Sequence, residues 1–191
     1  MGLTRNQVVI VAILLAGATL VVLNQTLLSP AYPSIMADLQ ADATTVQWLT
    51  SAYSLVEAIV IPLSAFLIGR FPTRKLFIAG VSVFALGSLM AAFSPFFGIL
   101  LLGRIFQAAA TGVVMPMVFT VILLIFPREK RGSAMGIVSF VIGFAPAVGP
   151  SLSGLLVESV GWRSLFILVT ALAVLIVILA IVFLKSYGEF E

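Results

Sequence analysis

Long runs of apolar residues alternate with short polar breaks along the whole chain. Six runs approach or exceed the length needed to cross a bilayer, which is about 20 predominantly apolar residues in a helix. They predict transmembrane helices at about 7–28, 47–69, 76–94, 97–121, 133–157 and 164–184. The first run exceeds the apolar region of a secretory signal, so we interpret it as a retained span. We therefore predict an all-α membrane protein in which residues 1–191 form one six-helix domain.

The polar breaks contain residues that stop or interrupt helices. Proline cannot continue a helix, so we expect Pro30 and Pro33 to end the first span and Pro95 to form a tight hairpin. The polar stretch 37–47 is then a connection to the second span. Trp162, just before the last span, suits the membrane interface.

The composition excludes a water-soluble core for most of the chain. Of the residues, 62% are hydrophobic and 9% are charged, whereas soluble domains have about 25% charged residues. Lipid must therefore surround most of this chain, which predicts a multi-pass protein of the plasma or inner membrane. The net charge of +3 rests on ten basic residues, and their placement follows membrane topology, so we expect no nucleic-acid partner.

The basic residues occupy regular positions relative to the predicted spans. Arg5, the clusters within 70–75 and 128–131, and Lys185 are each separated from the next by two spans, so all four lie on one side of the membrane. The positive-inside rule makes that side cytoplasmic, and both termini with it. The opposite side holds Arg163 and the acidic residues Asp38, Asp42 and Glu158.

Two ionisable side chains lie within predicted spans, Glu57 in the second and Arg104 in the fourth. An ionised group at the bilayer centre costs about 2.5–3.5 kcal/mol, so such residues are functional candidates. Other polar residues lie on the same faces of the second and fourth spans, and the first span also carries polar residues. We predict a common aqueous cavity for substrate or protons, lined by Glu57, Arg104, Asn24, Gln25, Gln107 and Thr111.

Each of these candidates also has a structural alternative. Arg104 can cap carbonyls or pair within the bundle, and Glu57 can be protonated and packed. Asn24 and Gln25 can form hydrogen bonds between helices. By contrast, the sixth span is apolar all round, which is typical of a helix that faces lipid.

The fifth span has a stripe of small residues and prolines on one face. Such stripes let helices approach closely in lipid. Packing within the bundle explains the glycines, but an interior proline costs about 3 kcal/mol in an ordinary helix. A face that packs against a moving partner domain explains the prolines better. The predicted interface residues are Gly136, Gly143, Pro146, Gly149, Pro150 and Gly154.

Five motifs follow one another in a fixed order on the predicted spans. They are residues 23–33 (LNQTLLSPAYP), the basic loop that ends the stretch 62–75, and residues 102–107 (LGRIFQ), 143–154 (GFAPAVGPSLSG) and 161–166 (GWRSLF). In this order they resemble the N-terminal six-helix half of the major facilitator superfamily. They are most similar to its multidrug branch of drug/proton antiporters, many of which have fourteen spans.

The resemblance implies half of a rocking-bundle fold, with 3+3 helices and alternating access. It implies efflux of lipophilic or cationic compounds against proton entry. It assigns helices one and four to the cavity, two and five to the interface between halves, and three and six to the periphery. It also gives Arg104 a part in proton coupling and makes a cytoplasmic gate of Gly69, Arg70, Arg74 and Lys75.

The sequence departs from the family pattern at several positions. Asn24 stands where the first-helix motif has an aspartate, Gly69 occupies the acidic position of the basic loop, and Pro72 replaces a usual glycine. The usual gate salt bridges therefore cannot form at that loop. Our hypothesis is that Glu57 supplies the missing carboxylate.

Several function classes lack their required residues. The chain has no cysteine and no histidine, so we expect no enzyme activity, cofactor or metal. No phosphate-binding loop of an ATP-driven pump and no repeated polar filter of a channel is visible. The main alternative to transport is a membrane folding or assembly module that transports nothing by itself.

The expected partners follow from the transport hypothesis. They are the lipid bilayer, a small lipophilic or cationic substrate, protons and a second six-helix half. Family members hold their substrate between two halves, whereas this chain stops after the sixth span. We expect either a fragment of a longer protein or a half-transporter that pairs with itself as a two-fold homodimer.

Overall fold

We analysed a computed structural model, which describes residues 4–184. Within that range the chain is helical and has no strands. The elements are α1 (Arg5–Leu27), η1 (Ser29–Ala31), α2 (Tyr32–Leu39), α3 (Ala43–Arg70), α4 (Thr73–Ala92), α5 (Phe97–Ile125), η2 (Arg128–Lys130), α6 (Arg131–Val160) and α7 (Arg163–Phe183). Six of its segments are long and apolar enough to cross a membrane, with α1 to α2 counted as one. The predicted six-helix all-α fold is confirmed.

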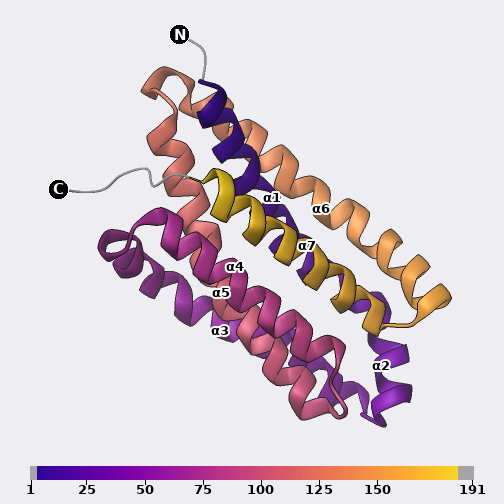
Figure 1. Cartoon of the computed structure of the whole chain (residues 1–191). Coiled ribbons are helices and arrows are strands. Elements are labelled where there is room, and N and C mark those ends of the chain that lie inside the picture. The colour runs from indigo at the N-terminus through magenta and orange to yellow at the C-terminus, as the bar shows by residue number, and fades with distance from the viewer. Residues whose placement is uncertain (1–3, 185–191) are drawn as a thin grey trace.

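The long helices run side by side, and their packing places α3 and α6 at opposite edges of the bundle (Figure 1). α5 packs on both α3 and α4, α4 packs on α7, and α1 joins α7 to α6. The two edge helices bury few of their residues, whereas α4 and α5 bury many. The bundle therefore has a closed interior and two largely uncovered edges.

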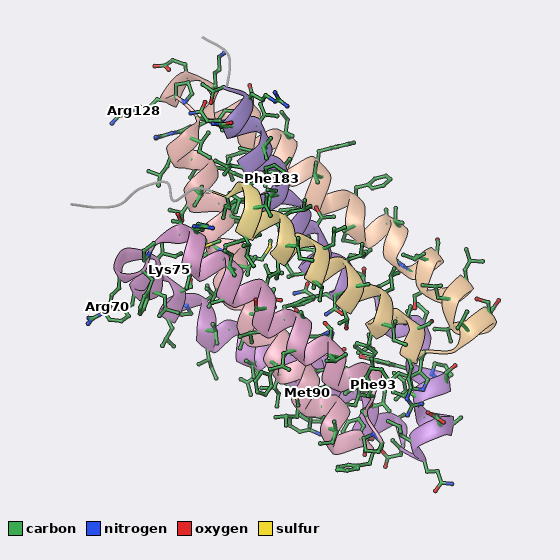
Figure 2. The ribbon with its side chains drawn as sticks, in the orientation of Figure 1. Arg70, Lys75, Met90, Phe93, Arg128 and Phe183 are labelled. Atoms are coloured by element: carbon green, nitrogen blue, oxygen red, sulfur yellow. The ribbon has the colours of Figure 1, made fainter. Side chains whose placement is uncertain are left out.

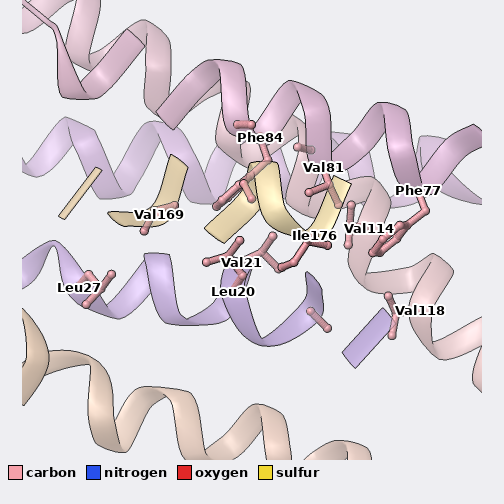
Figure 3. Close-up of a cluster of buried hydrophobic side chains, with 14 of the residues drawn as sticks. Leu20, Val21, Leu27, Phe77, Val81, Phe84, Val114, Val118, Val169 and Ile176 are labelled. Atoms are coloured by element: carbon pink, nitrogen blue, oxygen red, sulfur yellow. The ribbon is translucent and has the colours of Figure 1, made fainter. Parts of the chain in front are cut away.

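The core lies where α1, α4, α5 and α7 meet (Figure 3). Phe77 and Phe84 of α4 are fully buried there, beside Val114 of α5. Val169 and Ile176 of α7 belong to the same cluster. The last span is apolar all round, but only part of its surface is open: one face of α7 packs on α4, whereas Leu175 and Ile178 are exposed. An apolar sequence cannot reveal this, because in a membrane both packed and lipid-facing surfaces are apolar.

The chain stays helical through much of the predicted polar connection. α1 ends at Leu27, but Pro30 lies in the first turn of η1 and Pro33 in the first turn of α2. Proline is tolerated in a first turn because its missing N–H has no partner there in any helix. α2 continues to Leu39, and Gln40 ends it with a left-handed φ of 50°. The connection before α3 is therefore much shorter than residues 37–47.

A polar cluster joins three segments at the end of the bundle opposite the basic loops. The carboxylate of Asp38 in α2 accepts hydrogen bonds from the Arg163 guanidinium and, at 3.1 Å, from the Trp162 indole N–H. Arg163 also donates to the carbonyl oxygen of Ser94 at 2.9 Å and lies 4.3 Å from the centre of the Trp162 ring. These contacts fix the start of α7 to α2 and to the α4–α5 hairpin.

α4 and α5 touch backbone to backbone at a pair of glycines. A Cβ placed on Gly103 would lie 2.6 Å from the carbonyl oxygen of Gly87, and a Cβ on Gly87 would lie equally close to the Gly103 carbonyl. Neither helix can accept a side chain here without moving its backbone. Close approach of this kind is a main source of helix association in lipid.

We predict that Gly103→Ala destabilises the bundle by about 1–3 kcal/mol, the usual range for overpacking a tight contact. Gly136→Ala is the matched control, because nothing lies within 4 Å of a Cβ at that position. Its melting temperature in detergent should stay the same or rise slightly, since alanine favours a helix. Equal melting temperatures for the two variants would contradict the contact.

α3 begins with a charged cap that makes its stability depend on pH. Asp42 accepts a hydrogen bond from the Thr45 backbone N–H at 2.6 Å. That bond and one to the Thr45 hydroxyl hold the pKa of Asp42 below its ordinary value of 3.8. A lowered pKa in the folded state contributes stability above the ordinary value, and this is lost as the pH falls through the lowered pKa.

We expect the melting temperature of the wild-type chain to fall more than that of Asp42→Asn as the pH is lowered below 3.8. Asparagine caps a helix about as well as aspartate but does not titrate. The other carboxyl groups are common to both proteins, so the difference between the two curves reports on Asp42. Parallel curves would show that the cap does not contribute.

Candidate functional site

Polar side chains from four helices meet inside the bundle, with Gln107 of α5 at their centre. Its side-chain N–H groups donate to the Ser88 hydroxyl at 2.8 Å and to the Asn24 carbonyl oxygen at 3.4 Å. Its own carbonyl oxygen accepts from Arg104 at 2.9 Å and from Asn24 at 3.2 Å. Gln107 therefore joins α1, α4 and α5 through one fully satisfied amide.

Arg104 connects this group to α3. Its guanidinium is buried, lies 4.2 Å from the centre of the Tyr53 ring, and donates from Nε to the Leu49 carbonyl oxygen at 3.4 Å. A desolvated cation over an aromatic face is attracted by the ring quadrupole. Among residues 4–184 no carboxylate forms an ion pair with it. Its positive charge is thus held by an amide, a carbonyl and a ring.

Tyr53 and Thr111 complete the set of buried contacts. The Tyr53 hydroxyl and the Thr111 hydroxyl lie 2.6 Å apart, and Thr111 donates to the Gln107 backbone carbonyl at 2.9 Å. We call Asn24, Tyr53, Ser88, Arg104, Gln107 and Thr111 the polar core. Tyr53 and Ser88 were not predicted as site residues. Tyr53 could have been found, because it lies one helical turn before Glu57, whereas Ser88 resembles any other serine of an apolar helix.

The predicted cavity is therefore only partly observed. The structure brings Asn24, Arg104, Gln107 and Thr111 together, as expected, but their exposed fractions are only 0–3%. Asn24 forms interhelical hydrogen bonds and Arg104 binds a backbone carbonyl, which are the contacts expected if these residues have a structural role. The prediction that these four residues face water is wrong for this structure, because they form hydrogen bonds with one another instead of with water.

Glu57 and Gln25 form a separate and more open pair. The Gln25 amide donates to both carboxylate oxygens of Glu57, at 3.4 and 3.2 Å, and so joins α1 to α3. Both side chains are half-buried, and the stripe of Gln47, Ser51 and Ser54 that precedes Glu57 on α3 is exposed. Glu57 is thus at the boundary between the bundle interior and an uncovered face of α3.

The predicted gate residues divide into two groups, of which Figure 2 labels Arg70 and Lys75. Gly69, Arg70 and Lys75 are exposed at the turn between α3 and α4. Arg74 instead donates to the carbonyl oxygen of Ile181 at 2.7 Å. The last carbonyls of a helix have no partner within it, and a cation near them also interacts well with the helix dipole. Arg74 therefore caps α7 within the bundle.

The small-residue stripe of α6 also divides. Gly136, Gly143, Pro146 and Pro150 are exposed, and Gly154 has open space around its Cα. Gly149 is an exception and corrects our prediction, because it is buried against Thr26 of α1. It shares the inner face of α6 with Ala145 and Ser153, at intervals of four residues.

The Ser153 hydroxyl donates to the Leu27 carbonyl at the end of α1. This bond and the close contact at Gly149 attach α6 to α1. The exposed members of the stripe lie on the other side of the same helix, where the bundle has no covering element. One face of α6 therefore packs on α1, and another face exposes small residues.

The chain belongs to the Major Facilitator Superfamily, whose family profile matches residues 14–189. It is 52% identical over 181 residues to the uncharacterized MFS-type transporter YcnB of Bacillus subtilis (strain 168), with 95% of this chain and 38% of that protein covered. It is 40% identical over 181 residues to the lincomycin resistance protein LmrB of the same organism, with the same two coverages. This confirms a multi-pass integral membrane protein of a transporter family.

Other matches widen the range of transported compounds and support the fold. The chain is 29% identical over 182 residues to the riboflavin transporter RibZ of Clostridioides difficile (strain 630) and covers 40% of it. It matches the inward-facing, occupied crystal structure of a bacterial homologue of the human lysosomal transporter Spinster. That match has a TM-score of 0.86 at 17% identity and covers all of this chain but 47% of the other. The chain spans a little over a third of the length of YcnB and LmrB.

We predict that Gln107→Leu destabilises the bundle by about 1–3 kcal/mol, because buried partners on three helices, one of them charged, lose the hydrogen bonds that they make with Gln107. Gln47→Leu makes the same chemical change at an exposed position of α3 and should change stability little. Thermal unfolding of both variants in one detergent measures the difference. A Gln107→Leu variant as stable as Gln47→Leu would show that the polar core does not hold the bundle.

Proposed function

We propose that this chain forms one six-helix half of a proton-coupled exporter of lipophilic or cationic compounds. Membership of the superfamily supports transport, and the resistance activity in the name of LmrB supports export of a drug. The similarity to a riboflavin transporter keeps other aromatic small molecules within the candidate substrates. In this proposal the substrate is bound between this half and a second one.

The pair of Glu57 and Gln25 is the observation that carries the proposal. A carboxylate can bind a proton or attract a cation, and protonation removes the attraction, so the two compete for one site. Glu57 is the one acidic residue placed well inside a spanning segment of residues 4–184. The half-buried Gln25 amide holds both of its oxygens. An ionisable group at a partly open boundary is suited to exchange a proton for a cationic substrate.

The polar core has a different part in this proposal. Alternating access moves one half against the other as rigid bodies. Hydrogen bonds among α1, α3, α4 and α5 keep this half rigid while Glu57 changes its charge. Arg104 lies over the ring of Tyr53, which is one helical turn before Glu57 on α3, so its buried charge is close to the part of α3 that carries the carboxylate. This supports a role for Arg104 in coupling that does not require direct contact with substrate.

The uncovered edges support a second half as partner. α3 exposes large apolar side chains such as Phe66, and α6 exposes Phe140 on the helix that carries the small residues. We propose that the second half covers these helices, whether it comes from the same longer chain or from a second copy. In the same proposal Arg70 and Lys75, which are exposed beside Gly69, form the cytoplasmic gate.

The test is transport by the chain reconstituted in liposomes with a pH gradient and a fluorescent cationic dye. We predict that Glu57→Gln abolishes dye movement driven by the gradient, because glutamine cannot release a proton. Glu158→Gln is the matched control, since Glu158 is exposed at the end of α6, and it should transport like the wild type. Circular dichroism checks that both variants fold.

Two other outcomes would contradict the proposal. Full transport by Glu57→Gln would remove Glu57 from the mechanism. A wild-type chain that inserts but moves no dye would contradict the form of the proposal in which a second copy supplies the second half. It would favour a membrane module, or a fragment, that transports nothing by itself.

A further inference from the structure

A continuous apolar groove runs along α1 on the side of α6. Its first part is a cavity of about 260 Å³ between the N-terminal half of α1, the end of α5 and the start of α6. Its second part is a cavity of about 460 Å³ between α1, α6 and α7. Ala12 and Leu15 line both parts, so the two cavities adjoin.

The groove offers almost nothing to a polar ligand. Its lining is apolar except for Thr19, whose hydroxyl already donates to the Leu15 carbonyl at 2.7 Å. It extends along α1 from Val8 to Leu23, which at 1.5 Å per residue is about 22 Å. One leaflet contributes about 15 Å to the hydrocarbon core of a bilayer. The groove is therefore long enough for a complete acyl chain.

Cations surround the basic end of this groove. Arg5 lies one helical turn before Val8, which lines the first cavity. Arg131 donates from Nε to the carbonyl oxygen of Phe126, another lining residue, so its guanidinium is held at the mouth. Arg128 is exposed in the same turn between α5 and α6 (Figure 2). Glu129 is the one acidic residue in that turn.

We propose that this groove binds an anionic phospholipid of the bilayer. The acyl chain lies in the groove along α1, and the phosphate group is bound by Arg5, Arg128 and Arg131. A basic pocket between transmembrane helices, next to the membrane surface, is the arrangement that recognises anionic lipid headgroups. The positive-inside rule alone accounts for basic loops, but not for a groove of acyl-chain length that opens beside one of them.

Bound lipid would also complete the bundle at a weak place. α6 is attached to α1 near its C-terminal end, through Gly149 and Ser153, whereas its first half buries Ala134 and Val138 but also borders the cavity. An acyl chain there fills the space between α1 and α6 and gains van der Waals contact on both sides.

The experiment uses native mass spectrometry of the whole chain, incubated with equal amounts of phosphatidylglycerol and phosphatidylcholine that have the same acyl chains. We expect retention of phosphatidylglycerol over phosphatidylcholine. Replacing two of the three groove arginines, Arg5→Gln with Arg131→Gln, should lower its affinity about fivefold for each arginine, since a basic residue near an anionic surface contributes about 1 kcal/mol. The matched control is Arg70→Gln with Lys75→Gln, at the same end of the bundle but on the α3–α4 turn.

A second variant tests the groove itself. Ala12 is exposed to the groove and outside the core, so Ala12→Leu fills the space without disturbing the fold, which circular dichroism verifies. It should reduce retention of both lipids several-fold, whereas Ala65→Leu, an exposed site on α3, should not.

Equal retention of the two lipids would overturn the proposal, as would an equal loss in the Arg70 and Lys75 control, which would indicate general attraction to the basic surface. Unchanged binding in Ala12→Leu would show that no acyl chain enters the groove. A chain that appears as a lipid-free dimer, and dissociates on Ala12→Leu, would identify a second copy as the occupant instead.

Discussion

Hydrogen bonds buried in hydrocarbon are the interaction on which this bundle depends. Water is not available in the bilayer to satisfy the amides of Asn24 and Gln107 or the guanidinium of Arg104, so their partners must come from neighbouring helices. The observed arrangement of α1, α3, α4 and α5 provides all of these partners together. Dispersion contacts in lipid are less specific, because lipid chains compete for the same apolar surfaces. The polar core therefore fixes which helices are neighbours.

This interior leaves the functional features at the margins of the bundle. Glu57 and Gln25 lie where α1 and α3 meet an uncovered face, so Glu57 remains accessible while Arg104 is enclosed. The two edge helices, α3 and α6, present apolar and small residues outward. A rigid interior, an accessible carboxylate and two uncovered edges are what a half that moves against a partner requires. In our proposal the groove along α1 adds a bound lipid to the same bundle.

Several residues have tertiary partners that differ from their predicted ones. Arg74 belongs by sequence to a basic loop, but it caps the end of α7, more than one hundred residues further along the chain. Gly149 belongs to a stripe of small residues, but it packs against α1, because a rotation of one hundred degrees per residue puts it about 120° around the helix from Gly143. Both differences come from helix orientation, which no short stretch of sequence contains.

The sequence by itself determined the six spans, the family and which helices carry polar residues, because these depend on local composition and on short motifs. It grouped Asn24, Arg104, Gln107 and Thr111 correctly but could not show that they are buried, and it missed Tyr53 and Ser88. Only the tertiary structure decided which polar groups bind one another and which remain open. The reason is that an apolar helix has the same composition whether it meets lipid or protein, so its rotation and its neighbours are set by contacts between distant parts of the chain.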